Sequence, residues 1–275
     1  MQPMTLIKDD PAQQEIKALL ERYDSARRMR GNWETLWQDC YDYAMPQRGG
    51  FLSDPIPGNR KSEKIYDATA MDAADQLAAS LLGNLTPIWS QWFGLKPGPE
   101  LSPAEAQRLA PVLEKAGKTI QDHFDRSNFA VEIHQCYLDL IVGGTASLAF
   151  EEADPGGFSA FRFSAIPLTQ ITLEESESGY LEGSYRLLSL TGEQIRARYS
   201  AADLPPELVK RALKDPQARF KVLEAVLPQN LIYIYKAILV EGTNTPTLLA
   251  SGQFEYSPFI NFRWMKSAGE SYGRS

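Results

Sequence analysis

The sequence predicts an α+β fold, with helices in the first half of the chain and mainly antiparallel strands in the second. Up to about residue 144, apolar residues recur at the three- and four-residue spacing of a helix face. After Gly144 the period falls to two, which is typical of half-buried strands. We therefore expect a helical region over 1–144 and a mainly β region over 145–275.

The composition indicates a folded protein. The chain has 275 residues, of which 43% are hydrophobic and 23% charged, close to the averages of globular proteins. A net charge of -7 and a pI of about 5.1 argue against a simple nucleic-acid-binding protein, which would be basic. The acidic charge does not exclude a protein past which DNA slides, because tight phosphate contacts would hinder sliding.

Cellular location follows from what the sequence lacks. Two cysteines, Cys40 and Cys136, support no disulfide framework and indicate a reducing, cytoplasmic origin. No apolar run approaches the roughly 18 residues of a membrane span, so we expect no membrane partner. The polar, acidic N-terminus is not a signal peptide.

The first 46 residues predict a helical hairpin. Residues 11–30 form its first helix, Gly31 breaks the pattern, and Asn32 caps a second helix that stops at Pro46. The second helix carries two tryptophans on one apolar face: Trp33, Leu36, Trp37, Cys40, Tyr41 and Ala44. We expect the tryptophan stripe to hold the hairpin onto the next helix, over 62–85.

Three further helices are expected before Gly144. A long loop over 46–62 leads to the helix over 62–85, whose alanines allow close approach by another helix. Ser102 and Glu105 form a capping box that opens a helix to about Arg126, with a kink or a later start at Pro111. A last helix spans 128–142 and ends at the glycine pair.

The second half predicts strands with two helical insertions. Thr191 and Gln194 form a second capping box, and Pro205-Pro206 opens another short helix to about Lys214. Ser178-Gly179 marks a hairpin. The expected strands lie within 145–152, 157–167, 169–175, 180–190, 230–242, 247–255 and 257–266.

No catalytic, cofactor-binding or metal site is predicted. The only histidines are His123 and His134, and no zinc-binding spacing is present. The glycines at 143–144 follow a helix, whereas a phosphate loop precedes one. Residues 269–275 lack the spacing and the lysine of a P-loop. The carboxylates over 174–182 lie in a hairpin and are expected to be solvated.

Surface aromatics are the remaining functional signal. Phe51, Trp89, Trp92 and Phe93 fall where loops are expected, and aromatic and arginine side chains are enriched at protein interfaces. The alternative is that these rings fold onto the core of their own chain. The interface candidates are Arg48, Phe51, Trp89, Trp92, Gly269 and Tyr272.

Four segments, over 22–47, 64–87, 89–97 and 261–275, resemble in their order and spacing the head-to-tail connecting (portal) proteins of short-tailed bacteriophages. The resemblance implies a non-enzymatic homo-oligomeric ring, of about twelve subunits, at one capsid vertex. Double-stranded DNA would be packaged and ejected through it. The implied partners are the major capsid and scaffolding proteins, the terminase and tail adaptor proteins.

The same resemblance implies a place within a longer subunit. The chain would be its N-terminal, wing-like part, and residues 269–275 would lead into a stem helix that lines the DNA tunnel. The tunnel, clip and crown would lie outside this sequence. The resemblance also implies assembly in the host cytoplasm and a final location in the virion.

Two other readings stay open on the sequence. One is a capsid or tail adaptor that binds its partner without forming a ring, which the solution mass would distinguish. The other is a hydrolase or nucleotidyl enzyme with an unrecognised site, which would show nucleotide turnover or nuclease activity that one carboxylate substitution abolishes.

Overall fold

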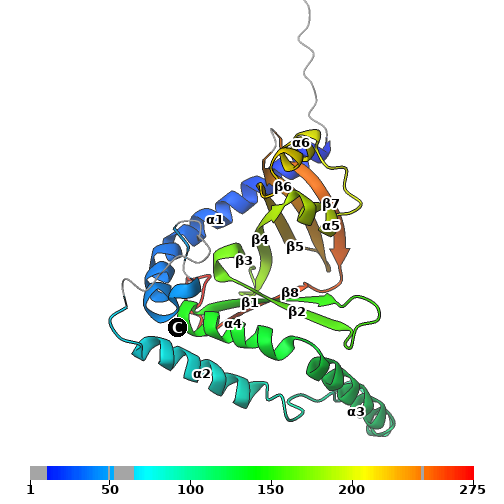
Figure 1. Ribbon diagram of the computed structural model, residues 1–275. Coiled ribbons are helices and arrows are strands. Elements are labelled where there is room, and N and C mark those ends of the chain that lie inside the picture. Colours follow the sequence, from blue (N-terminus) through cyan, green and yellow to red (C-terminus); the bar gives the residue numbers. More distant parts are fainter. Residues whose placement is uncertain (1–10, 49, 53–64, 243–244) are drawn as a thin grey trace, which may run out of the picture. The chain divides into compact units, whose positions relative to one another are not determined.

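A computed structural model describes residues 11–48, 50–52, 65–242 and 245–275 (Figure 1). It confirms the α+β class, with helices first and antiparallel sheets after them. The helices are α1 (Pro11–Ala44), α2 (Thr69–Leu85), α3 (Pro103–Arg126), α4 (Phe129–Gly143), α5 (Gly192–Arg198) and α6 (Pro206–Lys214), with short 3₁₀ turns η1 (Pro46–Arg48) and η2 (Leu168–Gln170). The strands are β1 (Thr145–Glu152), β2 (Phe161–Ile166), β3 (Ile171–Glu175), β4 (Leu181–Thr191), β5 (Arg219–Gln229), β6 (Ile232–Glu241), β7 (Thr247–Phe254) and β8 (Phe259–Arg263).

The chain divides into two compact units, each discontinuous in sequence. Unit 1 comprises residues 1–36 and 170–257, and unit 2 comprises 37–169 and 258–275. Both units combine helix with sheet, whereas the change from helix to strand along the chain falls at Gly144, as expected. Within the described ranges, no helix combines the length and the apolar character needed to cross a bilayer.

The predicted helical hairpin at the N-terminus is wrong, because α1 continues through Gly31 for 34 residues. A glycine inside a helix costs only about 1 kcal/mol relative to alanine, so tertiary packing can override it. One buried stripe keeps its register across Gly31, with intervals of three, four and seven residues. Its members are Ile16, Tyr23, Ala26, Arg30, Trp37 and Tyr41.

Unit 1 is built on a five-stranded antiparallel sheet in the order β3-β4-β5-β6-β7. One face packs against α5 and α6 through a cluster that includes Ile195, Leu208 and Phe220. The other face packs against the first part of α1, where Tyr23 lies 5.4 Å from Tyr185 between ring centroids. The central strands are therefore buried on both faces.

The central strand β5 was absent from the predicted strands. Its sequence, RFKVLEAVLPQ, lacks strict alternation because both faces are covered, and Val222 to Val226 are buried without interruption. Glu224 within that run also argues against predicting a buried strand from the sequence, since a buried carboxylate is rare unless it is paired. The expected hairpin between β3 and β4 is confirmed, with Gly179 at a φ of 82°.

Unit 2 is built on the three-stranded antiparallel sheet β2-β1-β8 and on α4, which packs against β1 and β2. Gly144 has a φ of 72° and caps α4, so the predicted helix stop is confirmed. Helix α2 begins at Thr69, and residues 62–64 of the expected helix lie outside the described ranges. It packs against α4 and buries Ala74 and Ala78, as its alanine content suggests.

Both predicted capping boxes are present, Ser102 with Glu105 on α3 and Thr191 with Gln194 on α5. Helix α3 starts at the first box and runs through Pro111 without ending there. Pro111 is exposed, so water can satisfy the carbonyl that the missing amide leaves without its helical partner.

Candidate functional site

Three of the six predicted interface residues lie around the end of α1, inside unit 2. The Trp37 ring lies 5.5 Å from the Phe51 ring and 4.9 Å from the Tyr272 ring, between centroids. Trp37 and Tyr272 are buried and Phe51 is half-buried. The indole nitrogen of Trp37 donates a hydrogen bond to the Gly143 carbonyl oxygen over 3.0 Å. Trp37 thus packs against Phe51, the end of α4 and the C-terminal segment, whereas we expected the tryptophan stripe to pack on the helix over 62–85.

Arg48 joins the same region through a buried acidic group. Its guanidinium lies 2.8 Å from the Asp139 carboxylate and donates to the Gln135 carbonyl oxygen over 3.1 Å. The Tyr41 hydroxyl donates to Asp139 over 2.8 Å. Burial raises the pKa of Asp139 more than the Arg48 charge and the Tyr41 hydrogen bond lower it. Arg48 therefore fastens the segment after α1 to α4.

The glycine-rich C-terminal motif makes a close backbone contact. A Cβ atom on Gly144 would lie 2.3 Å from the Gly273 carbonyl oxygen, and one on Gly273 would lie 2.2 Å from the Gly144 oxygen. The Gly273 amide donates to the Thr145 hydroxyl over 2.8 Å. Gly269, a predicted interface residue, is exposed with a φ of 81° and has nothing near its Cβ position.

Trp92 anchors the aromatic segment after α2 to the rest of unit 2. Its ring is stacked at 10° on Phe129 and lies edge-on to Phe124 and Phe93. No sequence pattern predicted the single aromatic cluster that the segment after α2 forms with α3, α4, β1 and β2. The cluster consists of Trp92, Phe93, Phe124, Phe129, Phe150, Phe161 and Phe163.

Trp89 differs from the other aromatic candidates because it is 74% exposed. Leu85 and Ile88, its neighbours along the chain, are also more than half exposed. We call these three residues the apolar strip. Helix α3 also exposes Leu109 and Val112. An exposed apolar group of this kind is typical of a surface that a partner covers.

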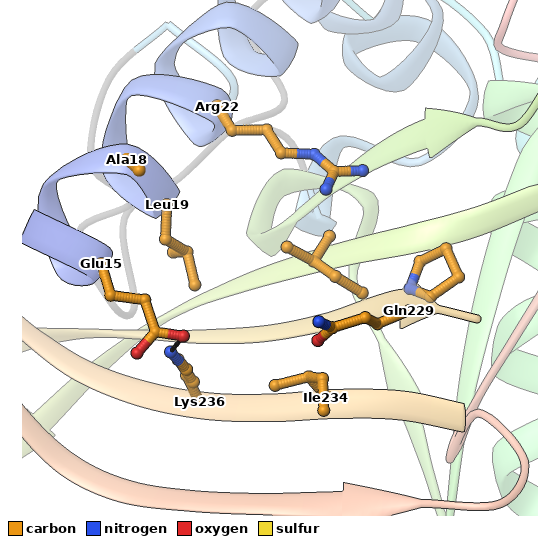
Figure 2. A pocket seen from close by; sticks show the side chains of 9 residues that line it. Glu15, Ala18, Leu19, Arg22, Gln229, Ile234 and Lys236 are labelled. Carbon is orange, nitrogen blue, oxygen red and sulfur yellow. Dashed lines mark ion pairs between the residues drawn. The ribbon is translucent and has the colours of Figure 1, made fainter. Parts of the chain in front are cut away.

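Unit 1 contains a cavity of about 390 Å³ between the start of α1 and the β5–β6 hairpin (Figure 2). Its two cations already face carboxylates of the same chain: Lys236 pairs with Glu15, and Arg22 pairs with Glu174 at 2.8 Å. The rest of the lining is mostly apolar, so the cavity is not an anion site. It is lined by Glu15, Ala18, Leu19, Arg22, Leu227, Pro228, Gln229, Ile234 and Lys236.

The described residues hold no group of three or more histidine, cysteine or acidic side chains arranged for a metal ion. Cys40 and Cys136 are free thiols, and burial raises the pKa of each. His123 accepts a hydrogen bond from the Ala160 amide over 3.2 Å. This ring therefore has a structural partner within its own unit.

Glu224 is a buried carboxylate that, like Asp139, the sequence did not reveal. It is 1% exposed at the centre of the unit 1 sheet. Arg198 lies 2.8 Å from its carboxylate, and the hydroxyls of Tyr199 and Tyr235 donate to it over 2.8 and 3.1 Å. The buried acid is thus paired with a cation and accepts hydrogen bonds within its own chain, which compensates its burial.

A family model described as bacteriophage head to tail connecting protein matches residues 16–275. The portal protein of Salmonella phage epsilon15 is 26% identical over 189 residues, which cover 67% of this chain and 33% of that protein. The portal protein of Escherichia phage T7 is 22% identical over 270 residues, which cover 92% of this chain and 47% of that protein.

The chain thus spans between a third and a half of the length of these relatives. The family match, in contrast, covers both compact units and nearly all of the described residues. By that match, the chain belongs to the bacteriophage head to tail connecting protein family.

Proposed function

We propose that this chain forms part of a ring-shaped portal subunit at one vertex of a phage capsid. Double-stranded DNA is packaged and ejected through the ring, and the tail attaches to it. The observation that carries the proposal is the family match over residues 16–275, together with two relatives that are portal proteins. The role is structural, and chemistry on DNA or nucleotides belongs to partner proteins such as the terminase.

The exposed surface of unit 2 supports contacts between copies. A ring needs two different surfaces on each subunit, which meet in a head-to-tail manner around the circle. The apolar strip is a candidate for one of them, because Trp89 stands out from the surface while Trp92 fixes the same segment to the aromatic cluster. A rigidly held aromatic side chain loses little conformational entropy on binding.

The other predicted interface residues are proposed to have different roles, either in a surface contact or in packing within unit 2. Gly269 remains a candidate for a surface contact, since it is exposed. Phe51, Tyr272 and Arg48 contribute by holding the ends of α1, α4 and the C-terminal segment together. The major capsid and scaffolding proteins, the terminase and tail adaptors are the further proposed partners, and the virion is the proposed location.

The mass of the full-length protein in solution tests the proposal. Light scattering should give about twelve copies, and negative-stain images should show an annulus with a central hole. A stable monomer would instead support an adaptor without a ring. Nucleotide turnover or nuclease activity that one carboxylate substitution abolishes would support an enzyme.

A matched pair of variants tests the apolar strip. Trp89→Ala should weaken ring assembly at least tenfold in the concentration needed, because interface aromatics dominate binding energy. Phe158→Ala removes an aromatic ring that is 92% exposed at the β1–β2 turn, and assembly should be unchanged. Equal assembly by both variants would remove the strip from the proposed interface and leave the ring itself untouched.

A further inference from the structure

The edges of the two sheets differ in how they are protected. An edge strand has unpaired backbone groups, and proteins usually guard it with charges, proline, bulges or short length. Strand β3 is five residues long, carries Glu174 and Glu175 and has an irregularity between them. In the other sheet, β2 carries Arg162, and β8 is five residues long and carries Arg263.

Strand β7 lacks these protections in its second half. Its sequence, TLLASGQF, has neither charge nor proline. The pairing with β6 is irregular at Ala237 and Ile238 but regular from Ala250 to Phe254. Residues 251–254 are exposed, and β7 pairs only with β6 among the described strands (Figure 1). A regular, uncharged and exposed edge of this kind can accept another strand.

The side chains along this edge indicate what would fit. Gly252 lies opposite Tyr235, and a Cβ atom on Gly252 would be 4.0 Å from the tyrosine ring, in ordinary contact. The Tyr235 and Phe254 rings lie 5.9 Å apart on the same face. A large apolar side chain opposite Gly252 would cover both rings, as aromatic side chains do beside strand glycines.

Charge indicates which residue should begin the added strand. Glu255 follows β7 directly and is exposed. Every neighbouring pair in this sheet is antiparallel, so an added antiparallel strand would begin beside Glu255. A basic residue at its start would complement that carboxylate, whereas a charge in its middle would meet only uncharged side chains.

We propose that residues 250–254 of β7 bind an extended segment of another protein by strand addition. The segment is uncharged over its middle, carries an apolar side chain opposite Gly252 and begins with a basic residue beside Glu255. A second copy of this chain is the rival occupant. Antiparallel β7–β7 pairing is a two-fold contact that closes at two copies, unlike the contact that builds a ring.

A designed peptide serves as the probe: acetyl-Lys-Val-Thr-Phe-Ser-Val-Thr-amide with a fluorescent label. Pairing its lysine with Glu255 places its phenylalanine opposite Gly252. Fluorescence anisotropy with the full 275-residue chain should show saturable binding. Hydrogen exchange should show protection confined to the amides of β7 and its neighbour β6. Absence of binding, or protection elsewhere, would overturn the proposal.

Backbone methylation separates strand addition from simple apolar contact. In one analogue the even-numbered amides are methylated, and in a second the odd-numbered ones. Only one set of amides in an added strand faces β7. One analogue should therefore lose at least tenfold in affinity while the other binds like the parent peptide. Equal affinity for both would exclude strand addition.

Variants of the chain complete the test. Ser251→Lys and Gln253→Lys place charges on the edge and should each weaken binding of the parent peptide about tenfold. Leu213→Lys adds the same charge at an exposed position of α6 and should leave binding unchanged. If β7 amides are already protected in the free protein and the protein is a two-fold dimer, a second copy occupies the edge and the proposal is wrong.

Discussion

The indole nitrogen of Trp37 donates a hydrogen bond to the carbonyl oxygen of Gly143 over 3.0 Å. Gly143 is the last residue of α4, where the final carbonyl groups of a helix lack partners within the helix. Trp37 thus satisfies one of them with a side chain that also packs edge-on against Tyr272. One residue of α1 links the end of α4 to the C-terminal segment.

Two substitutions separate the hydrogen bond of Trp37 from its packing. Trp37→Phe keeps most of the apolar contact but leaves the Gly143 oxygen without this donor, which should lower the free energy of unfolding by about 1–3 kcal/mol. Trp37→Ala also opens a cavity and should lower it by about 3–5 kcal/mol. Urea unfolding followed by tryptophan fluorescence measures both values.

Trp89→Ala is the control for these measurements. Trp89 is mostly exposed, so its removal should change the stability of the isolated chain by less than about 0.5 kcal/mol. If Trp37→Ala also changes the stability by less than about 0.5 kcal/mol, the Trp37 contacts do not stabilise unit 2.

The glycines at 144 and 269 form a second matched pair. Both have positive φ, 72° and 81°, so alanine is strained by about 1–2 kcal/mol at each. Only at Gly144 would the added Cβ also collide with backbone, at 2.3 Å from the Gly273 oxygen. Gly144→Ala should therefore lower the thermal midpoint much more than Gly269→Ala. Similar midpoints would mean that the contact between residues 144 and 273 relaxes easily.

Local chemistry made much of this fold predictable from the sequence. Capping boxes, the glycine helix stop and the Ser178-Gly179 turn each depend on a few neighbouring residues, and all are present. The helix break at Gly31 was wrong, because the buried stripe of α1, which runs from Ile16 to Tyr41, outweighs one glycine. Strand β5 was missed since its burial on both faces removes the alternation that marks a strand.

The places of the interface candidates were less predictable. Exposure of an aromatic residue depends on distant segments, and the sequence shows no difference between Tyr272 and Trp89. Tyr272 is buried because Gly273 allows its segment to approach Gly144 closely. Trp89 is exposed because the ring of Trp92, three residues later, packs into the aromatic cluster in its stead.

Asp139 should make the stability of the chain depend on pH in the acidic range. Burial raises its pKa above the usual value in spite of Arg48. The unfolded chain therefore ionises this group first, and the stability that the group contributes at low pH is lost as pH rises from about 4 through the folded-state pKa. Asp139→Asn removes this dependence.

Urea unfolding of the wild type and of Asp139→Asn between about pH 3 and pH 7 tests this sign. The wild type should lose stability relative to the variant as pH rises, because the variant has no group to ionise at this position. A relative gain with rising pH would mean that Arg48 outweighs burial and lowers the pKa of Asp139.

Tyr235 should contribute to a loss of stability in alkali. Burial is the largest cause that raises its pKa, followed by the charge of Glu224, to which its hydroxyl donates over 3.1 Å. A raised folded-state pKa means that its contribution is complete below the unfolded pKa of about 10 and is lost as pH rises beyond it. Tyr235→Phe should therefore lose less free energy of unfolding than the wild type between about pH 9 and pH 11.

At neutral pH the same variant should be less stable than the wild type by about 1 kcal/mol, because Glu224 loses one of its donors. Tyr256→Phe, at a mostly exposed tyrosine, is the control, and its free energy of unfolding should match that of the wild type both at neutral pH and in alkali. Urea midpoints across this range measure the effect. If Tyr235→Phe loses stability in alkali as steeply as the wild type, ionisation of this phenol does not open the centre of the unit 1 sheet, and the loss begins elsewhere in the chain.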